Sequence, residues 1–142
     1  MTLTGAVSLP LDHAGTSVAN LAVSEAFYRD VFGFTHVEDT FTLAKYNLSG
    51  MVLRNDAGAR IELFEKQGSV PMRAADPNEG TAYHGWFQVA FASRDVAADY
   101  ARVVAAGATE IKPPFIAPDG KTTVAFVADP DGNLIELIER AG

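Results

Sequence analysis

The 142-residue sequence contains no cysteine, which excludes disulfide bonds, thiolate metal ligands and thiol nucleophiles. It also contains no hydrophobic run approaching the roughly 20 residues that a membrane-spanning helix needs. The first ten residues lack the basic start and long apolar stretch of a secretory signal. Together these absences predict a cytoplasmic protein.

Positive charge is scarce as well. The chain has 11 lysines and arginines against 18 aspartates and glutamates, a net charge of −7. An acidic chain with scattered cations does not complement a phosphate backbone or an anionic lipid surface, so we expect neither nucleic acid nor membrane as a partner. The hydrophobic fraction of 48% is normal for a folded protein, and the length favours one domain over residues 1–142.

The chain does contain a repeat. Residues 61–65 read Ile-Glu-Leu-Phe-Glu and residues 135–139 read Ile-Glu-Leu-Ile-Glu, an offset of 135 − 61 = 74. Gly33 and Gly107, each expected to end a helix, recur at the same offset. The sequence therefore predicts a duplicated module, with a first copy at about 9–65 and a second at about 86–139.

Each copy has the pattern of a β-α-β-β-β unit. Asn20 and Asp95 are good helix N-caps. Apolar stripes with i, i+4, i+8 spacing follow them, formed by Val23, Phe27 and Val31 in one copy and by Val96, Tyr100 and Val104 in the other. The segment 39–47 is ambiguous. Strands are expected at 9–17, 34–37, 51–53, 60–64, 86–91, 109–112, 122–127 and 134–138.

Residues 66–85 separate the copies. They are rich in proline and glycine and contain few large aliphatic residues, a composition typical of a linker or a mobile lid. Arg73 or His84 of this segment would contact a substrate if the lid closes.

Four polar residues occupy equivalent places in the two copies. His13 precedes Glu62 by 62 − 13 = 49 residues, and Gln88 precedes Glu136 by 136 − 88 = 48. Each copy thus offers one nitrogen or oxygen donor on its first strand and one carboxylate on its last. Because related halves pack with equivalent residues facing each other, we expect these four side chains to bind one cation.

Glu136 carries the physical argument for such a site. Side chains alternate across a strand, so Glu136 shares its face with Leu134 and Ile138. A carboxylate on an apolar face is costly unless it is paired or bound to a metal. Taken alone, each glutamate also fits the solvated face of an antiparallel strand.

The sequence contains two further histidines. His84 shares its parity with Gln88 and is an alternative third ligand, although its spacing of 136 − 84 = 52 breaks the repeat. His36 has no partner at repeat spacing and is interpreted as a surface or strand-packing residue.

Four segments resemble the vicinal oxygen chelate superfamily, which includes glyoxalase I, methylmalonyl-CoA epimerase, extradiol dioxygenases, and fosfomycin and bleomycin resistance proteins. The resemblance extends over about residues 9–139 and implies an α+β fold, in which two β-α-β-β-β modules form a cup-shaped mixed sheet around one divalent metal, often within a homodimer. It maps the metal ligands onto His13, Glu62, Gln88 and Glu136. The segments are 11–13, 27–34, 60–63 and 129–137.

This ligand set resembles that of glyoxalase I, which uses His or Gln on the first strands and Glu on the last. Extradiol dioxygenases and fosfomycin enzymes need two histidines and one glutamate, and Gln88 departs from that pattern. Epimerase-like members usually have glutamine at the position of Glu62. Bleomycin-binding members generally lack the ligands.

The resemblance implies an isomerase, lyase or epimerase that acts on a small α-oxo or enolisable compound. Oxygen-rich ligands with one imidazole suit Ni, Co, Zn, Mn or Mg. Such an ion would stabilise an enediolate, and Glu136 is the first choice for the base, with Glu62 as the alternative. Candidate substrate contacts are Tyr46, Arg60, Phe64, Trp86 and Phe126.

Two other functions remain open. One is a metal-free binding or resistance protein that stacks an aromatic compound on Trp86, Phe64 or Phe126. The other is an extradiol-type dioxygenase. No grouping of the cations is visible in the sequence, so glutathione dependence rests on the resemblance alone.

Overall fold

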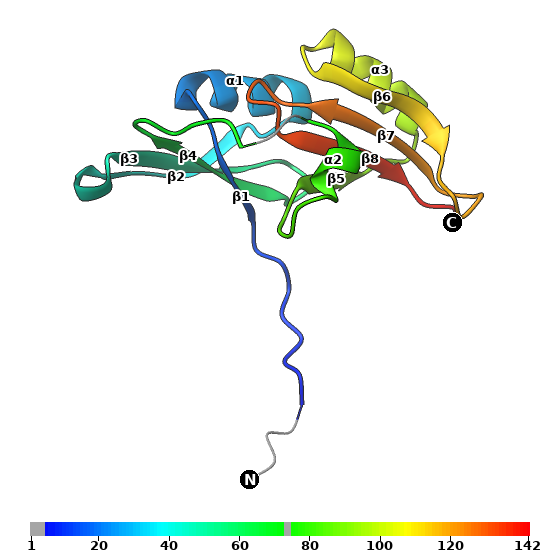
Figure 1. Cartoon of the computed structure of the whole chain (residues 1–142), viewed down its shortest axis with the longest axis horizontal. Helices are drawn as coiled ribbons and strands as arrows, with labels where there is room; N and C mark the ends of the chain where they lie inside the picture. Colours follow the sequence, from blue (N-terminus) through cyan, green and yellow to red (C-terminus); the bar gives the residue numbers. More distant parts are fainter. Residues whose placement is uncertain (1–4, 73–74) are drawn as a thin grey trace.

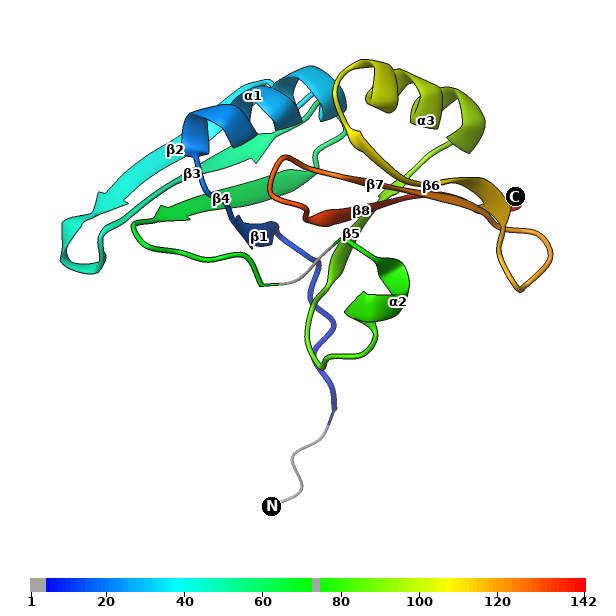
Figure 2. The same cartoon turned by 45° about the horizontal axis from the view of Figure 1, so that its top comes forward.

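The structure, a computed structural model, describes residues 5–72 and 75–142. The chain has an α+β fold with two four-stranded mixed sheets, which confirms the predicted fold class. The sheets lie side by side beneath helices α1 and α3, and the N-terminal segment projects from the side opposite the helices (Figures 1 and 2).

The two halves share one topology. The sheets have the strand orders β1-β4-β3-β2 and β5-β8-β7-β6, and in each the first strand is parallel to the last. The elements of the first half are β1 (Ala14–Ser17), α1 (Leu21–Phe32), β2 (His36–Leu43), η1 (Ala44–Tyr46), β3 (Leu48–Arg54) and β4 (Arg60–Lys66). Those of the second half are α2 (Pro77–Gly80), β5 (Gln88–Ala92), α3 (Val96–Ala105), β6 (Thr109–Ile116), β7 (Thr123–Ala128) and β8 (Leu134–Glu139).

Several strand boundaries differ from the prediction. β1 begins at Ala14 rather than near residue 9, because Ala14 pairs with Ile61, the second residue of β4, and the partner strand reaches back no further than Arg60. β6 continues to Ile116 through two prolines, which an edge strand tolerates. The ambiguous segment 39–47 forms the end of β2 and the short helix η1.

The helix ends follow the predicted capping chemistry. The Asn20 side chain accepts a hydrogen bond from the Val23 backbone N–H, and Asp95 does the same for Ala98. Gly33 ends α1 with φ 71, a left-handed conformation that glycine adopts without strain. The short helix α2 was not predicted, although Asp76 caps it and proline opens it, both recognisable start signals.

The predicted apolar stripe of α1 is wrong at one position. Val23 is 51% exposed, whereas the buried side chains of this helix are Ser24, Phe27 and Tyr28. The buried face is therefore rotated by about one residue, and the buried hydroxyl of Ser24 donates to Asp131 at 3.3 Å, Oγ to Oδ2.

One apolar core lies between the helices and the sheets and runs through both halves. The rings of Phe32 and Phe91 stack across the two halves with centroids 5.0 Å apart. The Tyr28 hydroxyl donates to Asp129 Oδ2 at 2.8 Å, and both residues are buried. These contacts show that the two halves pack on each other within one chain.

Each repeated pentapeptide contributes its last glutamate to a helix end. Glu65 Oε2 accepts from the Leu21 backbone N–H at 2.6 Å, and Glu139 Oε2 accepts from Val96 N–H at 3.0 Å. The first N–H groups of a helix have no partner within the helix, and the helix dipole favours an anion there. Glu65 and Glu139 are thus structural residues at equivalent positions.

Replacing Glu65 or Glu139 with alanine is expected to lower the free energy of unfolding by about 1 kcal/mol, as loss of a helix cap typically does. For a chain of this size, that corresponds to a melting temperature lower by about 2–5 °C. Thermal denaturation measures the effect. Ala22→Ser, an exposed substitution in the first turn of α1, is the matched control. Melting temperatures equal to that of the control would contradict the capping role.

Of the helices in the described part of the chain, not one has the length and apolar character required to cross a membrane.

Candidate active site

His13 and Glu62 meet at the edge of the first sheet. His13 directly precedes β1, whose Gly15 is opposite Glu62 in the parallel register. His13 Nε2 lies 2.9 Å from Glu62 Oε2, and His13 Nδ1 lies 2.8 Å from Asp12 Oδ2. The hydrogen bond to Asp12 raises the pKa of His13, and the charge of Glu62 raises it further.

The direction of Glu62 follows from strand alternation. Its neighbours Ile61 and Leu63 are 4% and 0% exposed and belong to the core beneath the helices. Glu62 points to the other face, where its side chain is 20% exposed. The core side of β4 thus anchors the strand and presents the carboxylate on the opposite face.

Gln88 and Glu136 form the corresponding pair in the second half. The Gln88 side-chain amide donates to Glu136 Oε2 at 2.6 Å. Burial raises the pKa of Glu136, while Arg140 and the bond from Gln88 act in the opposite direction. The neighbours on its face, Leu134 and Ile138, belong to a second apolar cluster, as the alternation predicted.

A pocket of about 440 Å³ opens on this same face of the second half. Phe126 is opposite Glu136 in the sheet register and stacks on Phe115 with ring centroids 6.3 Å apart. The residues around the pocket are Asp76, Pro77, Asn78, Ile111, Lys112, Phe115 and Phe126. The pocket is therefore lined by both polar and apolar side chains and lies under the start of α2.

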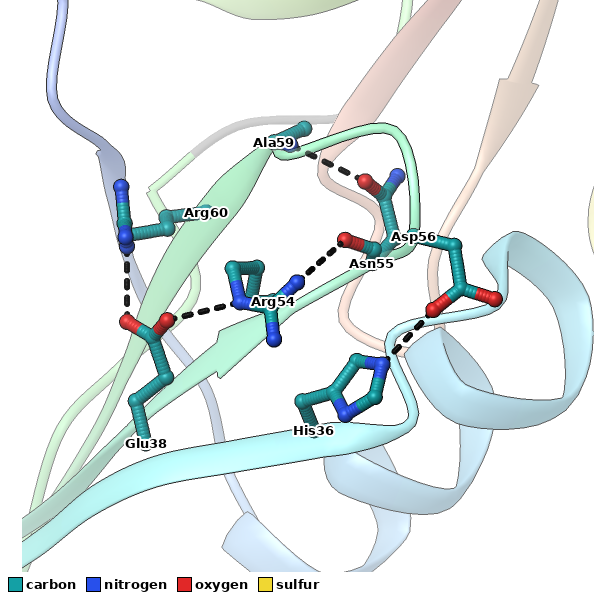
Figure 3. Close-up of polar contacts among 7 residues, drawn as sticks. All are labelled: His36, Glu38, Arg54, Asn55, Asp56, Ala59 and Arg60. Atoms are coloured by element: carbon teal, nitrogen blue, oxygen red, sulfur yellow. Dashed lines mark hydrogen bonds and ion pairs between the residues drawn. The ribbon is translucent and has the colours of Figure 1, made fainter.

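The corresponding face of the first half is charged. Arg54 and Arg60 both donate to the carboxylate of Glu38 (Figure 3). The sequence showed no grouping of the cations, and this interpretation was wrong for these two arginines. Their positions flanking the hairpin turn 55–59 place them opposite each other, a signal that was present in the sequence.

Three other residues predicted to contact a substrate, Phe64, Tyr46 and Trp86, lie in different parts of the fold. Phe64 packs on Phe41 with ring centroids 5.8 Å apart. Tyr46 is 54% exposed in η1, and its carbonyl accepts from Lys66 at the opposite end of β4 from Arg60. Trp86 is 97% exposed and precedes β5, so the prediction that it opens this strand is wrong.

The two remaining histidines, His36 and His84, are both exposed. His36 Nε2 lies 2.7 Å from Asp56 Oδ1 on the surface, in agreement with the interpretation as a surface residue (Figure 3). His84 is exposed in the segment before β5. Arg73 lies outside the described residues.

The four predicted metal ligands form two pairs, one in each half. Within residues 5–72 and 75–142, no three His, Cys, Asp or Glu side chains of a single chain form a group that could hold a metal ion. The donor types themselves, one imidazole, two carboxylates and one amide, suit a borderline to hard divalent cation. The sequence did not indicate four residues that lie beside the predicted ones. They are Asp12 beside His13, Glu38 and Arg54 beside Arg60, and Phe115 beside Phe126.

The fold agrees with that of a known family. The family model for the "Glyoxalase/Bleomycin resistance protein/Dioxygenase superfamily" matches residues 10–137. The chain therefore belongs to this superfamily, which confirms the resemblance seen in the sequence.

A curated relative is a probable lactoylglutathione lyase of Vibrio cholerae. It is 33% identical over 129 residues, which are 89% of this chain and 88% of that protein. Among solved structures, glyoxalase I from Zea mays superposes with a TM-score of 0.70 at 24% identity, over 92% of this chain and 44% of that one. This chain thus spans less than half of the maize enzyme. A glyoxalase family protein from Enterococcus faecalis gives a TM-score of 0.75 at 21% identity, over 92% and 97% of the two chains.

Proposed function

We propose that this protein is a metal-dependent, glyoxalase I-like lyase or isomerase acting on a small α-oxo or enolisable compound. The observation that carries the proposal is the pairing of a first-strand donor with a last-strand glutamate in each half, His13 with Glu62 and Gln88 with Glu136. The named function of the Vibrio cholerae relative supports the same class of reaction.

The site would be completed by a second copy of the chain. Each pair alone offers too few ligands to hold a catalytic cation, and the pairs of one chain do not form a common group. In the proposed homodimer, the His13–Glu62 pair of one copy faces the Gln88–Glu136 pair of the other. Two equivalent sites then form for every two chains.

The residues have separate tasks in the proposed reaction. A bound divalent ion would supply Lewis acidity toward a substrate carbonyl oxygen. Glu136 would remove the proton beside that carbonyl as a general base. The Gln88 amide holds this carboxylate in position, and Phe126, which stacks on Phe115, lies opposite it in the sheet register.

Metal loading tests the proposal directly. We expect the purified protein to bind close to one divalent ion per chain among Ni, Co, Zn, Mn and Mg, measured by elemental analysis after dialysis. His13→Ala is expected to weaken binding by about 10- to 100-fold or more, because it removes the only imidazole ligand. His36→Ala, which removes a surface imidazole, is the matched control and should bind metal normally.

The same samples test the dimer. Analytical ultracentrifugation should give a dimer for the loaded protein and a shift toward monomer after metal removal. A protein that takes up no divalent metal after loading, or a metal-loaded monomer with full activity, would refute the proposal as stated.

The two stacked phenylalanines of the pocket support a second candidate, a metal-free protein that binds small aromatic compounds. The walls of the pocket include the stacked rings of Phe115 and Phe126. Tight binding of an aromatic ligand without metal, lost in Phe126→Ala but retained in Glu136→Gln, would favour this function over the enzyme.

A further inference from the structure

Arg54 and Arg60 share a single carboxylate on the face of the first sheet that also carries Glu62. They lie directly opposite each other in the β3–β4 register, on either side of the hairpin turn (Figure 3). Arg54 Nε donates to Glu38 Oε1 at 2.8 Å, and Arg60 Nε donates to Glu38 Oε2 at 2.7 Å. Two guanidinium groups and one carboxylate leave this cluster with a charge of +1.

Both arginines retain N–H donors that are not used by Glu38. Within the described part of the chain, neither Nη1 nor Nη2 of Arg60 has a hydrogen-bond acceptor, and the same holds for Nη2 of Arg54. Arg54 Nη1 donates to the Asn55 carbonyl at 3.3 Å. The two side chains are 32% and 37% exposed. Since a guanidinium presents five N–H donors in a fixed fork, a second anion can be bound on these outer edges.

The cluster borders the candidate active site. Arg60 precedes Glu62 by two residues on β4, so both side chains lie on the same face of the strand. Extending the parallel register of β1 and β4 by one residue places His13 opposite Arg60.

The fold does not require arginines at these positions. The equivalent residues of the second half, 54 + 74 = 128 and 60 + 74 = 134, are Ala128 and Leu134. These two are also directly opposite each other in the β7–β8 register, and they are 2% and 5% exposed. The same strand pair is thus built with buried apolar residues in one half and with partly exposed cations in the other.

We propose that Arg54 and Arg60 form an anion-binding subsite that takes a carboxylate of the substrate remote from its reacting carbonyl. This placement rests on the proposed function, and it narrows the substrate class to α-oxo or enolisable compounds with a distal carboxylate. Glu38 orients both forks, and the bound carboxylate neutralises the remaining charge of the cluster. The part of the site around Gln88 and Glu136, with Phe115 and Phe126, would receive the apolar part of the substrate.

Two five-carbon acids test the subsite. 2-Oxoglutarate and 2-oxopentanoate have the same 2-oxo acid end and differ in the distal carboxylate. Calorimetric titration of the zinc-loaded protein is expected to show about 10-fold tighter binding of 2-oxoglutarate, the effect of one charge-assisted bidentate contact. Arg60→Gln and Arg54→Gln should each remove most of this preference, while the affinity for 2-oxopentanoate changes by less than about twofold.

Matched variants control for charge and folding. Arg29→Gln removes an arginine that is ion-paired on α1, outside this sheet face, and should keep the full preference. Arg60→Lys keeps the charge without the planar fork and should retain part of it. Thermal melts establish that each variant is folded.

The outcomes separate this inference from the proposed function. Equal affinity of the wild-type protein for the two acids, or a preference that survives in both glutamine variants, would overturn the subsite even where metal binds normally. The titration is repeated on metal-free protein, in which the same preference is expected at weaker affinity. A protein that binds no metal would therefore refute the proposed function, while a preference seen without metal would still support the subsite.

Discussion

Glu136→Gln is expected to lower turnover by about 10²- to 10⁴-fold, the range in which a positioned general base contributes to rate. The amide fills the same space as the carboxylate but accepts no proton at neutral pH. In the metal-free protein, the same substitution is expected to raise thermal stability near neutral pH, because it removes a carboxylate from an apolar face where burial raises its pKa. Activity and stability should thus change in opposite directions.

The pH dependence has a definite sign. A folded-state pKa above the ordinary value of 4.5 means that the folded protein retains a proton that the unfolded chain has released. The contribution of Glu136 to stability therefore falls as the pH rises from about 4.5 through its folded-state pKa, and it is constant above that. The difference in melting temperature between wild type and Glu136→Gln should widen over this interval and then level off.

Glu62→Gln is the comparison variant for the base assignment. Both substitutions remove one proposed carboxylate ligand, but only the one at Glu136 removes the proposed base. Turnover at saturating metal should therefore be much lower in Glu136→Gln than in Glu62→Gln. Full turnover of Glu136→Gln, or the reverse order of the two variants, would show that Glu136 is not the base.

Asp129→Ala is expected to destabilise the protein by about 3 kcal/mol. Asp129 is 2% exposed and accepts hydrogen bonds from the Tyr28 hydroxyl, the Asn133 side chain, and the backbone N–H groups of Asp131 and Asn133. Each buried donor left without an acceptor costs about 1–3 kcal/mol. For a chain of this length, the melting temperature should fall by about 6–15 °C.

Two milder variants show whether the loss arises at the contact between the halves. Tyr28→Phe removes one donor and leaves Asp129 with its other partners, so a loss of about 1 kcal/mol is expected. Asp131→Ala removes an exposed contact to the Ala19 backbone N–H and a partly buried contact to Ser24, and should cost a similar amount. Denaturant unfolding measures all three. A loss for Asp129→Ala no larger than those of the milder variants would contradict the role assigned to it.

Local rules explain why much of the fold was predictable. The N-caps Asn20 and Asp95 and the C-terminal glycine of α1, Gly33, act through their immediate neighbours, so their sequence signals are specific. The repeat then transfers each assignment from one half to the other. The error at Val23 arose because periodicity defines a stripe but not which flank of it meets the sheet.

The unpredicted features depend on contacts between distant segments. Tyr28 and Asp129 are 101 residues apart, and no local pattern connects them. The bulge between Val37 and Asp39 in β2 contains Glu38, which meets the two arginines, and a bulge shifts the strand register in a way that alternation cannot foresee. The start of β1 likewise depends on where its partner strand begins.

The repeated pentapeptide divides two tasks between its two glutamates. Glu65 and Glu139 bond to the first turns of α1 and α3, while Glu62 and Glu136, the proposed ligands, contact His13 and Gln88 instead. Substitutions at the second pair are therefore expected to leave the scaffold intact, so a descendant of this chain can lose or exchange the proposed chemistry by drift without first losing its shape. Such evolvability suits a superfamily whose shared name joins enzymes to a drug-resistance protein.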